Sequence, residues 1–258
     1  MNLSTYDHYG YAVVALLGTF GAVWAVLLAL ARPAWQPRLR QYQGVVPPFI
    51  NIVGVLFGLT LAFIANDSWN AHDKATSAVY REAGELRSLG VLSGTLPEPV
   101  QSELRLALVR YAESAADEWQ HLSRRESSGQ TDAVSAALLL RVASREVAAA
   151  AGEGLRGQML RSVAELRQSR ELRISLSQTH LNPLKWLGMA FLGLMCILSV
   201  AVVHVDHPRA AAASLLLFAL SAAPTAAIVL VQGNPFQQPS FVSAQPLLDA
   251  VRPILAAR

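Results

Sequence analysis

Residues 47–70 read PPFINIVGVLFGLTLAFIANDSWN. No charge precedes Asp67, and the run is long enough for a membrane helix, which needs about 20 residues to cross ~30 Å of hydrocarbon. Yet it holds one amide, Asn51, near its start and a second, Asn66, near its end. An amide facing lipid would have no hydrogen-bond partner. We therefore expect one side of this helix to face protein or water.

Charge is unevenly distributed along the 258 residues. Charged residues make up 15% of the chain, against about 25% in an ordinary soluble domain. Most of them lie in residues 67–185, where acidic and basic side chains balance. The net charge of +3 comes chiefly from arginines beside apolar segments, as expected at a membrane surface. The sequence therefore predicts a lipid membrane as a partner and no nucleic acid.

Four uncharged apolar segments approach the length of a membrane span. They are residues 11–31, 49–65, 186–203 and 210–231. Between the second and third, apolar residues recur at three- and four-residue steps among Ala, Leu, Glu and Arg, a helical pattern, and no strand pattern is evident. We predict an all-α integral membrane protein with four transmembrane helices and a helical cytoplasmic domain inserted between helices 2 and 3.

These patterns divide the chain into four parts. Residues 1–66 form a first transmembrane pair, 67–183 the helical domain, 184–232 a second pair, and 233–258 a tail predicted to pack on the helical domain. The tail has apolar residues that need a surface to cover them: Phe236, Phe241, Leu247, Leu248, Val251 and Ile254. Within the domain, breaks are expected at SGTLPEP, at ESSGQT and at residues 152–154. Thr95 and Glu98 have the spacing of a capping box.

Drawn as a helix, the opening stretch has three kinds of face. One face combines amides with apolar residues, and its members fall within about 80° of each other around the helix axis. They are Asn51, Val55, Leu59, Ala62 and Asn66. Gly54 and Gly58 form an adjacent strip of small residues that suits close approach of another helix. Phe57, Ile64 and Val53 suit lipid. Two interpretations stay open, because Asn51 could make an interhelical hydrogen bond within a monomeric bundle or face a pore on an oligomer axis.

Two motifs resemble the bestrophin family of ion channels. FGLTLAFIANDSWNAHDKATSAVYREAGELRSL resembles the segment that runs from the end of the bestrophin pore helix into the cytosolic helical domain. GNPFQQPSFVSAQPLLDAV resembles the segment that follows the last membrane helix in bacterial members. Both flank the same order of two helices, helical domain and two helices. The chain is similar to bacterial bestrophin-like membrane proteins.

The resemblance implies a homo-oligomer, usually a pentamer, that conducts inorganic ions passively through a central pore. It places Asn51, Val55 and Leu59 at the three neck positions, with Ala62 and Asn66 further along the lining and Asp67 at the pore mouth. The family neck is usually bulkier, so this one is expected to be wider or wetter. The acidic calcium-binding run of animal members is replaced by QQPSFVS, so calcium activation is not expected.

The second functional hypothesis is a non-conducting membrane scaffold or sensor with a closed bundle. An enzyme is not expected, because no nucleophile elbow, zinc, phosphate-loop or dinucleotide motif is present. No cofactor or metal site is predicted, since His204, Asp206 and His207 fit a solvated turn better than a ligand set. Of the 21 basic residues all but Lys74 and Lys185 are arginine, which suggests a bacterial plasma (inner) membrane.

Acidic residues of the helical domain allow one further hypothesis. Glu82, Glu85 and Glu113 could form a charged ring in an oligomer vestibule. The simpler expectation is that Glu82 and Glu85 pair with nearby surface arginines, and that Glu118 does the same with Arg124 and Arg125.

Overall fold

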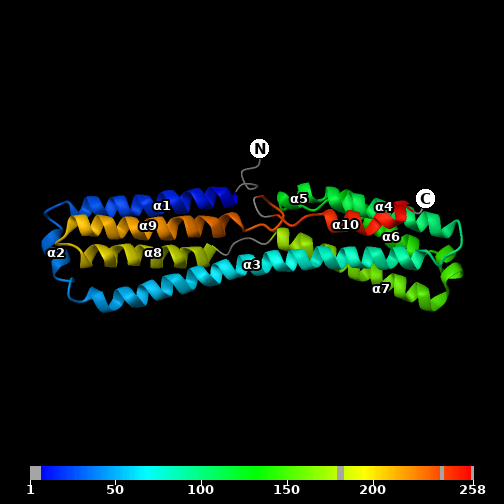
Figure 1. Ribbon diagram of the computed structural model, residues 1–258, viewed down its shortest axis with the longest axis horizontal. Helices are drawn as coiled ribbons and strands as arrows, with labels where there is room; N and C mark the ends of the chain where they lie inside the picture. Colours follow the sequence, from blue (N-terminus) through cyan, green and yellow to red (C-terminus); the bar gives the residue numbers. More distant parts are fainter. Residues whose placement is uncertain (1–6, 179–182, 239–240, 257–258) are drawn as a thin grey trace. The chain divides into compact units, whose positions relative to one another are not determined.

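The computed structural model describes residues 7–178, 183–238 and 241–256, and their regular secondary structure is entirely α-helical (Figure 1). The helices are α1 (Asp7–Leu30), α2 (Gln36–Arg40), α3 (Val46–Ser93), α4 (Val100–Asp117), α5 (Trp119–Ser123), α6 (Gly129–Ala143), α7 (Arg145–Gln178), α8 (Pro183–Val203), α9 (Pro208–Val231) and α10 (Gln245–Ala256). The all-α prediction is confirmed.

The chain divides into two compact units. The membrane unit comprises α1, α2, α3 as far as Trp69, α8 and α9. The helical unit comprises α3 from Asn70 onward, α4 to α7 and α10. The chain therefore enters the helical unit along α3, leaves it after α7, and returns to it after α9.

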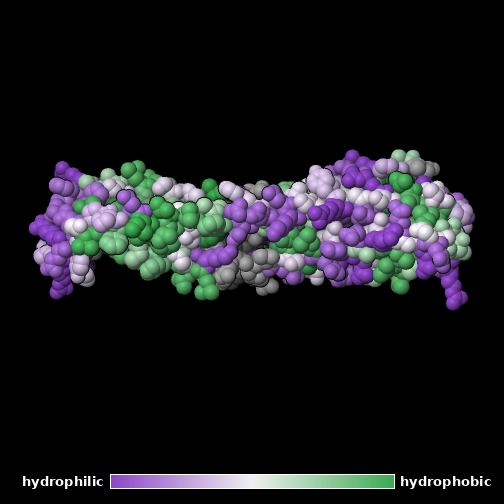
Figure 2. Space-filling view, turned by 90° about the horizontal axis from the view of Figure 1, so that it is seen from below, coloured by the Kyte–Doolittle hydropathy of each residue, from purple (hydrophilic) through white to green (hydrophobic). Residues whose placement is uncertain are grey.

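Four helices of the described chain are long and apolar enough to cross a membrane: α1, α3, α8 and α9. They contain the four predicted spans, apart from single residues at their ends. Apolar residues dominate the visible surface of the membrane unit in Figure 2, as expected for a surface in contact with lipid. An integral membrane protein of four spans is confirmed.

Small residues bring α1 and α9 together (Figure 1). Ala211, Ala219 and Ala223 of α9 are at most 1% exposed. Together with Leu215 they lie at four-residue steps, and so form one stripe of the helix. Val23 of α1 belongs to the same apolar cluster as Ala211 and Ala219. Small side chains let helix backbones approach closely. Because lipid tails are as apolar as leucine, membrane helices are held together by such close packing and not by the hydrophobic effect.

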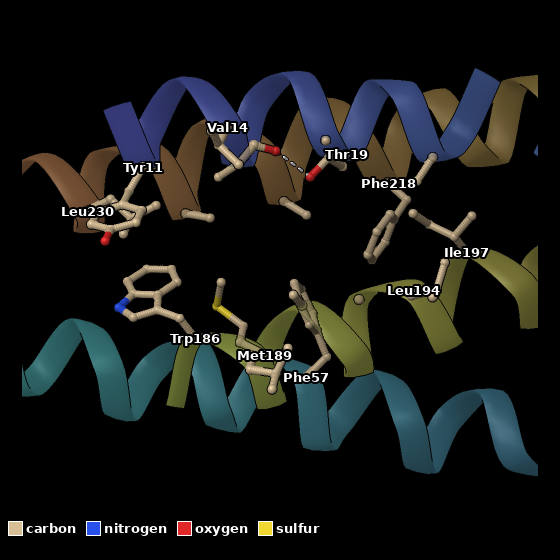
Figure 3. Close-up of a pocket in the computed structure, with 18 residues that line it drawn as sticks. Tyr11, Val14, Thr19, Phe57, Trp186, Met189, Leu194, Ile197, Phe218 and Leu230 are labelled. Atoms are coloured by element: carbon tan, nitrogen blue, oxygen red, sulfur yellow. Dashed lines mark hydrogen bonds between the residues drawn. The ribbon is translucent and has the colours of Figure 1, made fainter. Parts of the chain in front are cut away.

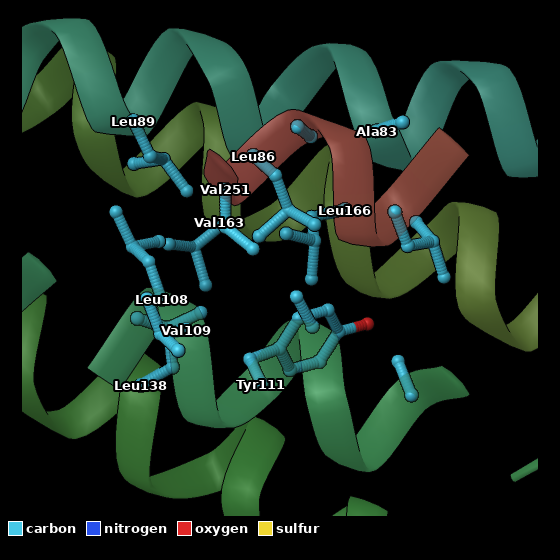
Figure 4. Close-up of a cluster of buried hydrophobic side chains, with 14 of the residues drawn as sticks. Ala83, Leu86, Leu89, Leu108, Val109, Tyr111, Leu138, Val163, Leu166 and Val251 are labelled. Atoms are coloured by element: carbon cyan, nitrogen blue, oxygen red, sulfur yellow. The ribbon is translucent and has the colours of Figure 1, made fainter. Parts of the chain in front are cut away.

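The helical unit has its own apolar core, in which five helices meet (Figure 4). Its members include Leu86 of α3, Leu108 of α4, Leu138 of α6, Leu166 of α7 and Val251 of α10. Each is at most 2% exposed. An amphipathic helix is stable only when its apolar face is buried against other elements, and these five helices bury their apolar faces against one another.

The tail covers this core from the end of the chain. Phe236, Leu247, Val251 and Ile254 are buried in it, whereas Phe241 remains 48% exposed. Two side chains anchor the tail. The Asn234 Nδ2 donates a hydrogen bond of 3.1 Å to the Leu122 carbonyl, and the Trp119 Nε1 donates one of 2.6 Å to the Val242 carbonyl. The tail is therefore fixed by polar contacts at α5 as well as by apolar burial.

One expected helix start is wrong, and one expected break is found. The Thr95–Glu98 capping box is wrong, because Thr95 donates its hydroxyl to the Leu92 carbonyl at the end of α3 and Glu98 accepts instead from the Ser102 N–H. The expected break at residues 152–154 occurs at Gly152, whose φ of 69° and ψ of 170° are non-helical.

A further break that the pattern did not reveal occurs at Ser144. Its extended backbone separates α6 from α7, and its Oγ accepts the Val147 N–H. A serine that caps the following helix is a common start signal.

The predicted surface pairing of Glu82 and Glu118 is wrong, and so is the vestibule position of Glu82. Both carboxylates are buried, at 0% and 1% exposure. Arg173 Nε donates to Glu82 Oε2 at 2.6 Å, and Arg170 Nη2 donates to Glu118 Oε1 at 2.6 Å. The Tyr111 hydroxyl also donates to Glu82. The arginine partners of Glu82 and Glu118 lie 91 and 52 residues away, beyond the reach of a local pattern.

The surroundings of this cluster favour the charged arginines. Burial alone would lower the pKa of Arg170, but its hydrogen bonds to Glu118 and Asp132 outweigh that effect and raise the pKa. The Trp119 ring lies 4.6 Å from the Arg173 guanidinium carbon and covers its face. Burial, and then Glu82, raise the pKa of Tyr111, which keeps its hydroxyl protonated as a donor.

We predict that Arg173→Met destabilises the helical unit by about 3–5 kcal/mol, because it leaves the Glu82 carboxylate buried without its cation. Thermal unfolding of the purified protein in detergent measures the effect. Arg161→Met, an exposed position on the same helix, is the matched control and should change little. The double variant Glu82→Leu with Arg173→Met should recover most of the loss. Equal losses in the single and double variants would contradict this account.

Candidate functional site

One face of α3 packs inside the membrane unit. Ile64 and Ala65 are buried there in a cluster with Met189 of α8 and Ala226 and Val229 of α9. Phe57 packs against this cluster. The expectation that Phe57 and Ile64 face lipid is therefore wrong.

Local geometry explains the position of Phe57. Its ring centroid lies 5.5 Å from that of Phe218, with the planes tilted by 50°. A Cβ added to Gly193 of α8 would lie 3.3 Å from the Phe57 ring. Helices α3 and α8 thus approach closely at Gly193 of α8. The absence of a side chain there makes room for the Phe57 ring of α3.

The opposite face of α3 is uncovered. The five residues of the predicted pore-lining stripe are all exposed in the single chain: Asn51, Val55, Leu59, Ala62 and Asn66. Val55 is 64% exposed and Leu59 is 53% exposed. Within the described chain, the Asn51 side chain makes no hydrogen bond to another helix. The interpretation in which Asn51 bonds inside a monomeric bundle is not what the structure shows.

The glycine strip beside the stripe is also open. A Cβ added to Gly54 or Gly58 would meet no atom within 4 Å. Close approach of another helix at these positions does not occur within the described chain. Any helix that packs there must come from another molecule.

The end of the α3 span is tied to its neighbours by two polar contacts. Lys185 Nζ donates to Asp67 Oδ2 at 2.6 Å, and Trp69 Nε1 donates to Gln232 Oε1 at 3.2 Å. By helix geometry Asp67 is rotated about 120° from Val55, the centre of the stripe. The structure thus places Asp67 beside Lys185, away from the face that carries the five residues of the predicted pore-lining stripe.

Sequence reasoning did not identify Lys185 or Gln232 as partners. They lie 118 and 163 residues from the groups that they contact, and nothing in the local pattern links them. The one available signal was their position next to the predicted ends of spans, where polar residues meet the interface.

The turn between α8 and α9 holds the candidate metal-ligand types. The Arg40 Nε donates to Asp206 Oδ1 at 2.7 Å, so this carboxylate already has a cation. A ring nitrogen of His204 lies 3.0 Å from the Val200 carbonyl. In residues 7–178, 183–238 and 241–256 no group of three or more ligand-type side chains is placed to hold a metal ion.

Comparison with known proteins shows which family the chain matches. Residues 17–247 match the family model of the Bestrophin-like domain. No curated protein matches the sequence. Three crystal structures of single-residue variants of a bacterial bestrophin homolog from Klebsiella pneumoniae are similar to this chain.

These structures agree with the chain over nearly its whole length. For one variant the TM-score is 0.71 at 14% identity, covering 95% of this chain and 98% of that one. A second gives 0.69 at 14% identity, with 94% and 97% covered. A third gives 0.69 at 12% identity, with 95% and 97% covered. The structural similarity shows a shared fold, and the match to the family model confirms the resemblance inferred from the two motifs.

We predict that Asp67→Asn lowers the free energy of unfolding by only about 0.2–1 kcal/mol, the range for exposed ion pairs. Both partners are more than half exposed, so water screens the pair. Thermal unfolding of Asp67→Asn, Lys185→Gln and the double variant gives the coupling energy between the two side chains. A coupling well above this range would show that another copy of the chain buries the pair.

Proposed function

The chain belongs to the Bestrophin-like family, and on that premise we propose that it forms a symmetric homo-oligomer that conducts inorganic ions passively. In this proposal the exposed face of α3 lines a central pore. Copies are arranged in a closed ring, as cyclic symmetry requires for identical contacts around an axis. The bestrophin resemblance favours five copies.

The observation that carries the proposal is the uncovered stripe with an amide near each end. Asn51 and Asn66 are exposed on a helix that is otherwise apolar enough to cross a membrane. Polar groups at membrane depth are tolerated where they face protein or a water-filled cavity, and are costly against lipid. A pore on an oligomer axis gives both amides water.

The middle of the stripe provides the constriction. Val55 and Leu59 lie between the two amides, and rings of apolar side chains can close a pore by expelling water from it. The amides of Asn51 and Asn66 would contact ions or their hydration water on either side of this apolar segment. Gly54 and Gly58, which meet no atom of their own chain, would let the neighbouring copy approach closely.

The proposed location is the bacterial plasma membrane, with the helical unit in the cytoplasm. The family layout supports this orientation, and more arginine and lysine flank the membrane on the helical-unit side than on the other. The five residues of the stripe are uncharged, so selectivity between anions and cations has to be measured.

We predict that Leu59→Ala raises ion flux, because it widens the apolar constriction. Flux of K⁺, Na⁺ and Cl⁻ is measured in turn with reconstituted liposomes. Leu56→Ala is the matched control, since Leu56 is similarly exposed, at 48% against 53%, but is rotated about 100° from the stripe centre. It should leave flux unchanged. An intact oligomer with no flux from any variant would instead favour the non-conducting scaffold.

We also predict that a cysteine at position 55 reacts with a charged, water-soluble methanethiosulfonate. Val55→Cys places the thiol in the proposed aqueous path, whereas Leu217→Cys on α9 lies outside that path and is expected to face hydrocarbon. The two positions are similarly exposed in the single chain, at 64% and 69%. The only native cysteine, Cys196, is 4% exposed and should give little background. Equal protection of both thiols in vesicles would argue against water at Val55.

A further inference from the structure

The membrane unit contains a cavity behind the packed face of α3. It has a volume of about 570 Å³ and lies between α1 and α9 on one side and α8 and Phe57 of α3 on the other (Figure 3). It is partly open to the surroundings of the unit. The proposed ion path, on the exposed face of α3, does not use it.

Small residues create this cavity. Gly18 and Ala22 of α1, Ala190 of α8 and Ala222 of α9 all line it. The backbones of the three helices do not close the space that these small side chains leave. A Cβ added to Gly18 would still meet no atom within 4 Å.

The lining is largely apolar, with its main polar groups at one end. Tyr11 and Trp186 lie at one end, and Phe218, Ile197 and Leu194 lie at the other (Figure 3). The Thr19 hydroxyl, the polar group along the wall, already donates to the Ala15 carbonyl at 2.7 Å. Beyond the end at Tyr11 and Trp186, the wall therefore offers water few hydrogen-bond partners and suits apolar guests.

The length of the cavity distinguishes between occupants. From Trp186 to Ile197 along α8 is roughly 16 Å at 1.5 Å per residue, about half of a ~30 Å hydrocarbon core and therefore one leaflet. An acyl chain of the bilayer occupies one leaflet, whereas a transmembrane helix crosses both. An acyl chain therefore fits this cavity better than a helix from a second copy.

We propose that this cavity binds one acyl chain of a membrane phospholipid, with the glycerol end at Tyr11 and Trp186 and the chain end near Ile197. Tyrosine and tryptophan favour the membrane interface, where the chain joins its polar head. The surrounding bilayer supplies this ligand at high local concentration. The bound chain contacts Phe57, and so supports α3 from the side opposite to Val55 and Leu59.

Photolabelling in vesicles tests the site without measuring conduction. The protein is reconstituted in phosphatidylcholine with a trace of phosphatidylcholine that carries a diazirine on one acyl chain, irradiated and mapped by peptide mass spectrometry. Met189 lines the cavity and is only 6% exposed, so label there reports a chain inside the unit. Label at Leu217, 69% exposed on α9, reports surrounding lipid.

Gly18→Leu should lower label at Met189 several-fold, because the new side chain fills the cavity, and should leave label at Leu217 unchanged. Gly21→Leu is the matched control on the same helix, since Gly21 is also exposed and open but does not line the cavity. Ala222→Leu fills the same space from α9 and should repeat the loss. Wild-type label at Met189 no higher than without irradiation, or equal label in all variants, would overturn the proposal.

Discussion

The bilayer interior offers no hydrogen bonds, and the arrangement of the membrane unit follows from that constraint. Helices satisfy their own backbones, which leaves only side chains to be placed. The apolar side chains of α3 divide between a face that packs on α8 and α9 and a face that its own chain leaves uncovered. Asn51 and Asn66 lie on the uncovered face. A solitary chain in lipid would leave these amides unsatisfied, so the constraint itself argues for assembly.

The same constraint explains what could be predicted from the sequence. Span number, approximate ends and the polar stripe followed from hydropathy and helical periodicity, because both depend on contrast between polar and apolar residues. Phe57 and Ile64 could not be assigned correctly, because lipid and the interior of a membrane bundle are equally apolar. The cavity was also beyond prediction, since Gly18 and Ala222 look like ordinary small residues until three helices are placed together.

In the helical unit the limits were of a different kind. The helical character of the unit was evident from the spacing of its apolar residues, and the need to cover the tail was evident from its apolar composition. Glu82 and Glu118 were expected on the surface because arginines stand near them in the sequence. The structure instead pairs them with Arg173 and Arg170 across long stretches of chain. Such buried pairs contribute more to choosing one packing arrangement than to net stability, because desolvation offsets most of their attraction. A single displaced helix would leave a carboxylate without its cation.

The return of the tail has a consequence for biosynthesis. The core of the helical unit includes Leu247, Val251 and Ile254, which leave the ribosome only after α8 and α9. During translation the other core residues are complete well before the last helix exists, and their apolar surface stays open while the second pair of spans inserts. Premature termination before α10 would therefore leave the whole unit without this covering helix. Exposed core of this kind is what chaperones and proteases recognise.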